Sequence, residues 1–201
     1  MSRETTHANL LDSAQALVMR DGFSATTVDR VIERAGVTKG AFFYHFPTKE
    51  ALAHALVARW AERDRAQLDA AMARASALAR DPGQRLLVLV GLLAEAADAE
   101  SSEDPGCLYA SFCYEAKLLD DTVRAEILAT FGYWHERLTP WFDAALGARP
   151  PRIDGIDGAG LLALLDTVFE GGLVMARIRG DNRALGAQLR QYRNYLELLF
   201  G

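Results

Sequence analysis

The segment at residues 36–50, Gly-Val-Thr-Lys-Gly-Ala-Phe-Phe-Tyr-His-Phe-Pro-Thr-Lys-Glu, constrains the fold of this chain more than any other. It predicts a turn at Gly36, a short helix that begins after Thr38, a break at Pro47, and then a longer helix. Residues 26–35 predict another short helix just upstream. Two short helices joined by a glycine-containing turn are typical of a helix-turn-helix, whose second helix lies in the DNA major groove.

Capping residues support these boundaries. Thr26 is expected to cap the first short helix, with Asp29 three residues later completing a carboxylate version of the capping box. Gly36 lies where a helix end adopts the left-handed conformation that glycine takes without strain. Thr38 and Thr48 are then expected to cap the next two helices.

The second short helix has two predicted faces. Phe42 and Phe46, four residues apart, are expected to point inward, toward a first helix over residues 3–21. The remaining positions face solvent or DNA. A packing or capping role for His45, and an ordinary solvated Lys49, are the alternatives to DNA contact. We expect base-edge contacts from Thr38, Lys39 and Phe43, phosphate contacts from Thr27, Tyr44, His45 and Lys49, and close approach to the groove at Gly40.

The stretch from about Thr5 to Leu52, about a quarter of the chain, resembles the DNA-binding domain of the tetracycline-repressor (TetR) family of bacterial regulators. Capping, aromatic and basic positions agree in order and spacing with the family. The family usually has tyrosine where this chain has Phe43, so Phe43 offers only an apolar contact, for instance to a thymine methyl. The resemblance rests on residues 10–14, 22–23, 26–28, 34–37 and 43–52.

This resemblance implies an all-α chain in two parts. Residues 1–50 would form the helix-turn-helix DNA-binding domain, and residues 51–201 a helical effector-binding and dimerisation domain. The implied protein is a ligand-responsive transcriptional regulator that binds a palindromic double-stranded operator as a homodimer and is released by a small-molecule effector. We favour repression over activation. No cofactor is expected.

Composition agrees with a helical protein of this kind. Half of the 201 residues are apolar, enough for one or two helical domains with real cores. Alternating β-branched runs are nearly absent. We find no signal peptide and no apolar run long enough to span a bilayer, and therefore expect a cytoplasmic protein without a membrane partner.

Charge is distributed unevenly. The net charge is −5, yet residues 1–50 contain six Lys/Arg and six Asp/Glu, so the acidic excess lies in the remainder. Phosphate attraction depends on local basic groups rather than on this sum. A DNA-binding domain without net charge predicts modest non-specific affinity for DNA, and tight binding is expected to require two such domains at once.

Two apolar seams near the C-terminus predict helices that pack at shallow angles. Either seam alone is explained by intramolecular core, but two together indicate a four-helix bundle made by two chains, as the resemblance also implies. The dimer-interface residues predicted in this way are Leu161, Leu165, Val168, Gly172 and Met175, followed by Leu185, Leu189, Tyr192, Leu196 and Leu199.

The predicted effector-binding and dimerisation domain is rich in aromatic residues at helical spacing. Core packing explains most of them, and an apolar ligand pocket with a few polar groups is the alternative. The candidate pocket residues are Tyr109, Phe112, Glu115, Phe131, Trp134 and His135.

Cys107 and Cys113 lie six residues apart and would face directions about 120° apart on one helix, so they are not expected to form a disulfide. No histidines lie at ligand spacing, and no metal site is expected. Buried reduced thiols are the simplest interpretation. Cys107 follows Pro105-Gly106 at a helix start, which lowers a thiol pKa, so an electrophile-sensing thiol is the alternative.

The chain contains no recognisable catalytic motif such as Ser-x-x-Lys, Gly-x-Ser-x-Gly or His-Glu-x-x-His, and we expect it not to be an enzyme. The competing hypothesis is a helical small-molecule carrier, or an enzyme with an unrecognised site, whose helix-turn-helix is only structural.

Overall fold

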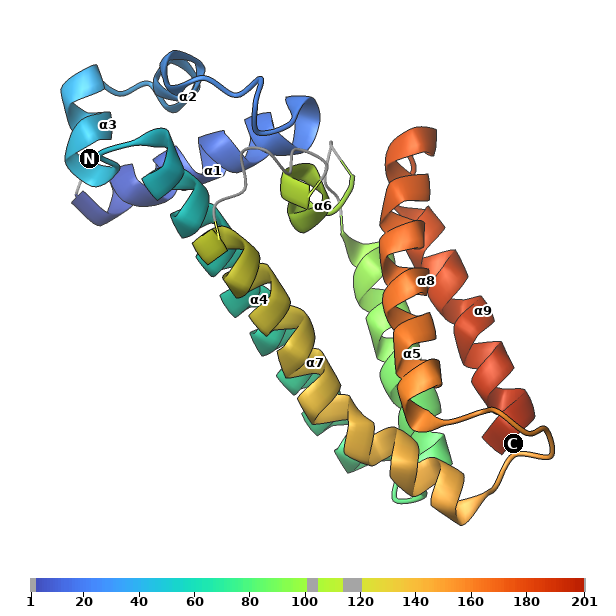
Figure 1. Cartoon of the computed structure of the whole chain (residues 1–201). Helices are drawn as coiled ribbons and strands as arrows, with labels where there is room; N and C mark the ends of the chain where they lie inside the picture. The colour runs from blue at the N-terminus through green and yellow to red at the C-terminus, as the bar shows by residue number, and fades with distance from the viewer. Residues whose placement is uncertain (1–2, 101–104, 114–120, 201) are drawn as a thin grey trace. The chain divides into compact units, whose positions relative to one another are not determined.

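A computed structural model describes residues 3–100, 105–113 and 121–200, and over these ranges every regular element is a helix. The all-α fold predicted from the sequence is confirmed (Figure 1). The helices in chain order are α1 (Arg3–Asp21), α2 (Val28–Ala35), α3 (Lys39–His45), α4 (Lys49–Leu78), α5 (Pro82–Ala99), α6 (Leu108–Cys113), α7 (Asp121–Ala148), α8 (Gly158–Arg179) and α9 (Arg183–Phe200).

The chain divides into two compact units. Unit 1 comprises Met1–Arg63 and Cys107–Ala129, and unit 2 comprises Asp64–Gly106 and Thr130–Gly201. Helices α4 and α7 contribute residues to both. The domain boundary predicted after residue 50 falls in the first turn of α4, which is one continuous helix.

The capping prediction for α2 is wrong by one residue. Thr27, rather than Thr26, caps the helix, and its side chain accepts a hydrogen bond from the Arg30 amide at 3.3 Å. Thr26 is buried, and its hydroxyl donates to the Gly22 carbonyl at 2.8 Å. Gly36 ends α2 in the left-handed region with φ 64°, as predicted.

The caps of α3 and α4 agree with prediction. Thr38 accepts a hydrogen bond from the Ala41 amide at 3.2 Å, and Thr48 accepts one from the Ala51 amide at 3.1 Å. Both hydroxyls therefore bind amides that no preceding helical turn can reach. The α1–α3 head has a small apolar core that includes Leu10, Ala14, Leu17, Val18, Phe23, Val31, Phe42 and Phe46.

Helix α6 packs on the head within unit 1. It spans Leu108–Cys113, and residues 114–120 lie outside the described ranges. The buried ring of Phe112 packs against Phe23, with ring centroids 4.8 Å apart. Phe112 was predicted to line a ligand pocket, whereas here it stabilises the corner between α1 and α2.

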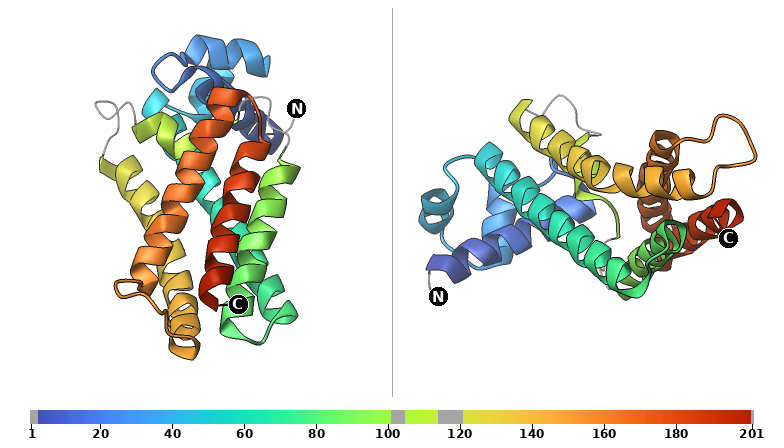
Figure 2. Two further views of the ribbon diagram at one scale, coloured as in Figure 1. Left: turned by 90° about the vertical axis from the view of Figure 1, so that its right-hand side faces the viewer. Right: turned by 90° about the horizontal axis from the view of Figure 1, so that it is seen from below.

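In unit 2, helices α8, α9 and α5 lie side by side in one layer (Figure 2). Residues of α4 and α7 complete the core behind this layer. Asp81 and Pro82 begin α5: Asp81 accepts a hydrogen bond from the Gln84 amide at 2.9 Å, and Pro82 occupies the first turn.

The two predicted dimer seams, on α8 and α9, pack against each other inside one chain, and α9 also packs against α5. Leu161, Leu165, Leu189 and Leu196 are buried there, and the Tyr192 hydroxyl donates to the Leu161 carbonyl at 2.7 Å. Side chains buried in this way cannot contact a second chain, so this part of the interface prediction is corrected. Gly172 and Leu185 are also buried, whereas Val168, Met175 and Leu199 are partly exposed.

Helix α8 is long and apolar enough to cross a membrane by length and composition alone, contrary to the expectation that no such run exists. Its inward face packs on α9 in unit 2, as the core helix of a globular protein does. The small and apolar residues of its outward face account for the rest of its apolar character.

Candidate nucleic-acid interface

Helix α3 is anchored on one side and exposed on the other. Phe42 is fully buried and Phe46 is 3% exposed, as predicted. On the opposite side Phe43 is 42% exposed and Tyr44 is 65% exposed, with Lys39 also at the surface. Two neighbouring aromatic rings thus form an exposed apolar area that a partner can cover.

Two threonine hydroxyls flank the exposed face. Thr27 and Thr38 are both exposed, and each accepts an amide hydrogen bond as a helix cap. A hydroxyl that accepts still carries one O–H donor. Each cap can therefore donate to an anion while it holds its helix end in place.

Lys39 lies next to an acidic group. Its ammonium is 3.6 Å from the Asp29 carboxylate, with side chains 69% and 81% exposed. An ion pair this exposed contributes little to stability. Lys39 is consequently free to exchange Asp29 for a stronger acceptor, such as a guanine edge.

Lys49 forms hydrogen bonds to backbone carbonyls of its own chain. Its ammonium donates to the Phe23 carbonyl at 2.7 Å and to the Ser24 carbonyl at 3.3 Å, and lies 4.3 Å from the centre of the Phe23 ring. These contacts tie the start of α4 to the corner between α1 and α2. They favour a structural role over the phosphate contact that the sequence predicted.

Gly40 and His45 complete the predicted set. A Cβ at Gly40 would approach only the Thr38 hydroxyl, at 4.0 Å, so the surface of α3 is open there. His45 is half-buried, and its ring lies 5.2 Å from that of Tyr44 and 5.6 Å from that of His7. One side of the His45 ring therefore packs against its neighbours, while part of the ring still reaches solvent.

A carboxylate and two arginines reinforce the corner behind α2. Arg30 binds both Asp21 and the Ala25 carbonyl. Hydrogen bonds from Arg20 and then from Arg30 lower the pKa of Asp21 to about 2. The sequence shows these charges, but their partners depend on the turn at residues 22–27, so sequence reasoning missed them.

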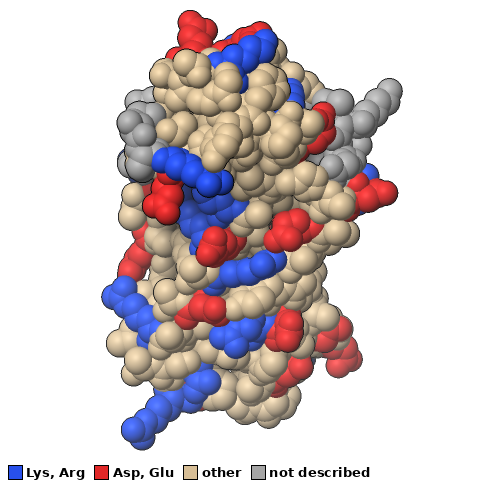
Figure 3. Space-filling model, turned by 90° about the vertical axis from the view of Figure 1, so that its left-hand side faces the viewer, with Lys and Arg blue, Asp and Glu red and all other residues tan. Residues whose placement is uncertain are grey.

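The surrounding surface is of mixed charge. On the face drawn in Figure 3, Lys/Arg and Asp/Glu side chains are intermingled over a largely uncharged surface. This pattern agrees with a head that carries equal numbers of basic and acidic residues. Specific contacts, rather than a large basic patch, must then supply selectivity for a nucleic acid.

Comparison with known proteins decides the family. Residues 10–56, which span most of α1 through the start of α4, match the sequence profile described as "Bacterial regulatory proteins, tetR family". The DNA-binding head of the chain belongs to the TetR family. The resemblance seen in the capping and aromatic residues is thereby confirmed.

The sequence similarity to known proteins extends beyond the head. The transcriptional repressor DhaR of Mycobacterium sp. (strain GP1) is 27% identical over 134 residues, which cover 67% of this chain and 64% of DhaR. The transcriptional regulator AcuR of Cereibacter sphaeroides is 28% identical over 144 residues, which cover 69% of this chain and 62% of AcuR. The chain thus spans less than two thirds of the curated relatives that it matches.

A solved structure shares the whole fold. A TetR-family transcriptional regulator from Agrobacterium tumefaciens superimposes with a TM-score of 0.76 and 23% identity, covering 100% of both chains. The named relatives are regulators, in agreement with the expectation that this TetR-family protein is not an enzyme.

The predicted ligand-binding residues fall into different units. Tyr109 lies in unit 1, buried, with its ring centre 6.5 Å from that of Trp60. In unit 2, Trp134 packs edge-on against Phe169, with ring centroids 5.4 Å apart. Phe131 and His135 also lie in unit 2, and Glu115 lies outside the described residues.

His135, predicted as a polar residue of the ligand pocket, is paired with a carboxylate. Its Nε2 lies 2.6 Å from an Asp166 oxygen, which links α7 to α8, and its side chain is 45% exposed. Among the predicted pocket residues in unit 2, His135 is thus the one with a carboxylate partner on a neighbouring helix.

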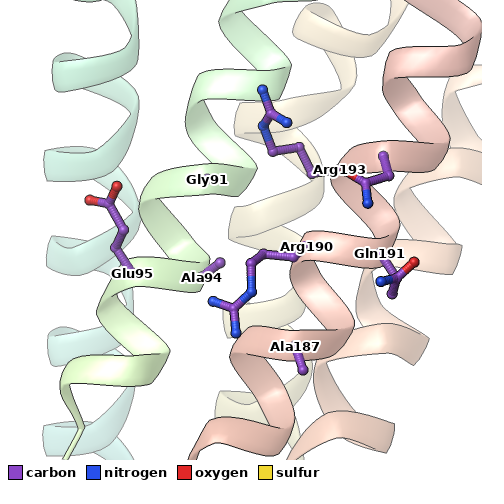
Figure 4. Close-up of a pocket in the computed structure, with 8 residues that line it drawn as sticks. Gly91, Ala94, Glu95, Ala187, Arg190, Gln191 and Arg193 are labelled. Atoms are coloured by element: carbon purple, nitrogen blue, oxygen red, sulfur yellow. The ribbon is translucent and has the colours of Figure 1, made fainter.

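A surface groove of about 470 Å³ runs between α5 and α9 (Figure 4). Its floor contains the small residues Gly91, Ala94 and Ala187, and Arg190 and Arg193 extend along it. Arg190 pairs with the Asp98 carboxylate at 2.5 Å, and Arg193 donates to the Leu87 carbonyl at 3.2 Å. Because both guanidinium groups are engaged with α5, this groove serves the packing of the two helices.

The cysteines are neither cross-linked nor equivalent. Neither forms a disulfide; Cys107 is buried and Cys113 is exposed. The Cys107 sulfur accepts a hydrogen bond from the Ala110 amide at 3.4 Å. Within the described residues no group of three His, Cys, Asp or Glu side chains is placed to hold a metal ion.

Proposed function

We propose that this TetR-family protein is a transcriptional regulator that binds double-stranded DNA through the exposed face of α3. The observation that carries the proposal is that α3 has one buried face and one exposed face. Phe42 is fully buried in the head, while Phe43 and Tyr44 stand in solvent next to Lys39. A helix anchored in this way presents a fixed row of side chains to the major groove.

We propose the following individual contacts. Thr38, Lys39 and Phe43 are assigned to base edges, since they begin and line the exposed side of α3. Thr27, Tyr44 and His45 are assigned to phosphates, with the Thr27 hydroxyl donating while it caps α2. Gly40 permits close approach, because its surface is open.

We further propose that two copies associate through the outward faces of α8 and α9. Leu164 and Ile178 on α8 are 41% and 71% exposed, and Leu198 on α9 is 86% exposed. Burying these side chains between two chains would form the four-helix bundle that the family resemblance implies. Two heads would then read successive major grooves about 34 Å apart.

The dimer has a direct test with a matched control. Ile178→Glu places a charge on α8, whereas Ile153→Glu places one at an equally exposed isoleucine in the loop before α8. Light scattering during size-exclusion chromatography is expected to show a monomer for the first variant and a dimer for the second. Two dimers, or two monomers, would exclude this interface.

The regulator is proposed to act as a repressor that a small-molecule effector releases. The name of DhaR, a transcriptional repressor, supports the first part, and that of the A-factor receptor protein of Streptomyces griseus, 35% identical over 52 residues, supports the second. Phe131, Trp134 and His135 remain candidate effector contacts. Opposition between effector and DNA corresponds to a coupling of about 1–3 kcal/mol. Access to the chromosome places the protein in the cytoplasm.

Fluorescence anisotropy with duplexes from the region upstream of the protein's own gene, and with random duplexes, tests DNA binding. Lys39→Ala is expected to weaken binding to the specific duplex by about 1–3 kcal/mol. Arg74→Ala, which removes an exposed cation from α4 in unit 2, should have no effect. Failure of the unchanged protein to bind any duplex would favour the carrier hypothesis.

A further inference from the structure

Two histidines meet where α1 passes the end of α3. His7 on α1 and His45 on α3 have ring centroids 5.6 Å apart, and the His7 ring also lies 4.9 Å from that of Phe46. Both histidines are half-buried, so one side of each ring is packed and the other reaches water. The pair lies directly beside the exposed face of α3.

Other charged groups surround the pair. On α1, Arg3 lies one turn before His7 and places its guanidinium 5.2 Å from the centre of the Tyr44 ring. Glu4, also one turn before His7, is exposed. On α4, Arg59 binds Asp12 and Gln15 at 2.7 Å each. We call Arg3, His7, Tyr44 and His45 the histidine corner.

The electrostatic environment of His7 is cationic. Burial is the largest cause that lowers the pKa of His7 below its ordinary value of 6.5, followed by His45, Arg59 and Arg3. Every charged group in this set is a cation that opposes protonation. An anion at the corner would reverse the balance, because it stabilises the protonated ring.

We propose that the histidine corner binds a DNA backbone phosphate and takes up a proton from solvent when it does so. Arg3 and His7 thereby join Tyr44 and His45 in contacting DNA. This inference rests on the proposed function and adds α1 to the contact surface. In sequence, His7 showed no partner, since its contact with His45 joins residues that are far apart along the chain.

The chemistry of imidazole explains the proton. A neutral ring carries one N–H donor, and a protonated ring carries two donors and a positive charge. Near neutral pH the free protein keeps His7 uncharged, because its pKa is lowered. A bound phosphate raises that pKa, so the complex holds a proton that the free protein lacks. His7 can take up at most one proton when the phosphate binds.

The sign of the pH dependence follows from this uptake. If the complex binds one more proton than the free protein, affinity rises as pH falls from the pKa of the complex toward that of the free protein. One proton corresponds to at most about tenfold in affinity per pH unit. We therefore expect the unchanged protein to bind its duplex about tenfold more tightly at about pH 6 than at about pH 8.

Two variants at one position test the proton. His7→Gln removes the titrating ring, and the ratio of affinities at about pH 6 and about pH 8 is expected to fall to about twofold or less. His7→Lys holds a positive charge across this range, so it is expected to bind tightly at both values and to lose the same dependence. His54→Gln, on α4, is the control: the His54 Nε2 lies 3.0 Å from the Thr122 hydroxyl, and this variant should keep the pH dependence of the unchanged protein.

These measurements separate the two proposals. Binding of the unchanged protein that is independent of pH, or a pH dependence that His7→Gln retains, overturns the histidine corner while leaving DNA binding intact. Absence of duplex binding at every pH overturns the proposed function and this inference with it. A purely structural role for His7 would lower the affinity of His7→Gln by the same factor at both pH values, which also contradicts the proposal.

Discussion

Alanine substitutions at Gly172 and Gly132 measure how closely α8 packs on α9. A Cβ at Gly172 would lie 2.7 Å from the Leu185 Cδ1 and 3.0 Å from its Cα, whereas a Cβ at Gly132 in α7 would meet no atom within 4 Å. Both glycines lie inside helices, so each substitution gains about 0.8–1 kcal/mol of helix propensity. Only Gly172→Ala adds overpacking, which typically costs about 1–3 kcal/mol.

The difference between the two variants isolates this packing term. We expect Gly132→Ala to exceed Gly172→Ala by about 1–3 kcal/mol in free energy of unfolding. For a chain of this size, each kcal/mol corresponds to about 2–4 °C in Tm. Urea unfolding followed by far-UV circular dichroism, at one protein concentration, gives both values. Equal stability of the two variants, or a more stable Gly172→Ala, would refute the close approach of α8 to Leu185.

Three further outcomes are expected. Lys49→Met should lower the free energy of unfolding by about 1–3 kcal/mol through loss of the hydrogen bond to the Phe23 carbonyl; a smaller salt slope of DNA binding with unchanged stability would restore the phosphate role. The pKa of Asp21 in the folded protein is about 2, below its ordinary value of 3.8, so its contribution to the free energy of unfolding is complete above pH 3.8 and is lost as the pH falls toward 2. Asp21→Asn should remove this acid-sensitive part of the free energy of unfolding, and an unchanged acid transition would contradict the Arg20 and Arg30 contacts. Phe43→Tyr should tighten operator binding about 2–10-fold by adding a hydroxyl to the exposed ring, as a hydrogen bond of about 0.5–1.5 kcal/mol implies; weaker binding in an anisotropy titration would mean that the apolar edge is required.

Local signals predicted the head well because its boundaries depend on local chemistry. Thr38, Gly36 and Pro47 act within a few residues of their own positions, and the helices begin and end where these residues indicate. The error at Thr26 and Thr27 is instructive. Two adjacent threonines have the same capping chemistry, and the burial of Thr26 against the Gly22 carbonyl decides between them.

Partners distant in sequence were not predictable in the same way. Lys49 carries a charge that suits phosphate, but its partner is a carbonyl 26 residues away that the turn after α1 brings within 2.7 Å. Phe112 has the character of a pocket residue, and only the packing of α6 on the head shows that it contacts Phe23.

The apolar seams illustrate a different limit. A repeat of three and four residues shows that a helix packs on another helix, but it is the same whether the partner belongs to this chain or to a second copy. Leu165 and Leu189 proved to face each other's helix within unit 2. The face left for a second copy is marked instead by exposed apolar side chains such as Ile178, which follow no strict repeat.

Photo-crosslinking at position 43 tests the central claim, that the exposed face of α3 contacts DNA, most directly. A benzophenone amino acid replaces Phe43 in one variant, and Ile153, 67% exposed in the loop before α8, in the control. With a duplex from upstream of the gene, we expect the first to crosslink to bases of that duplex and the second to give no DNA adduct. A bound duplex that crosslinks at position 153 but not at position 43 would contradict the account.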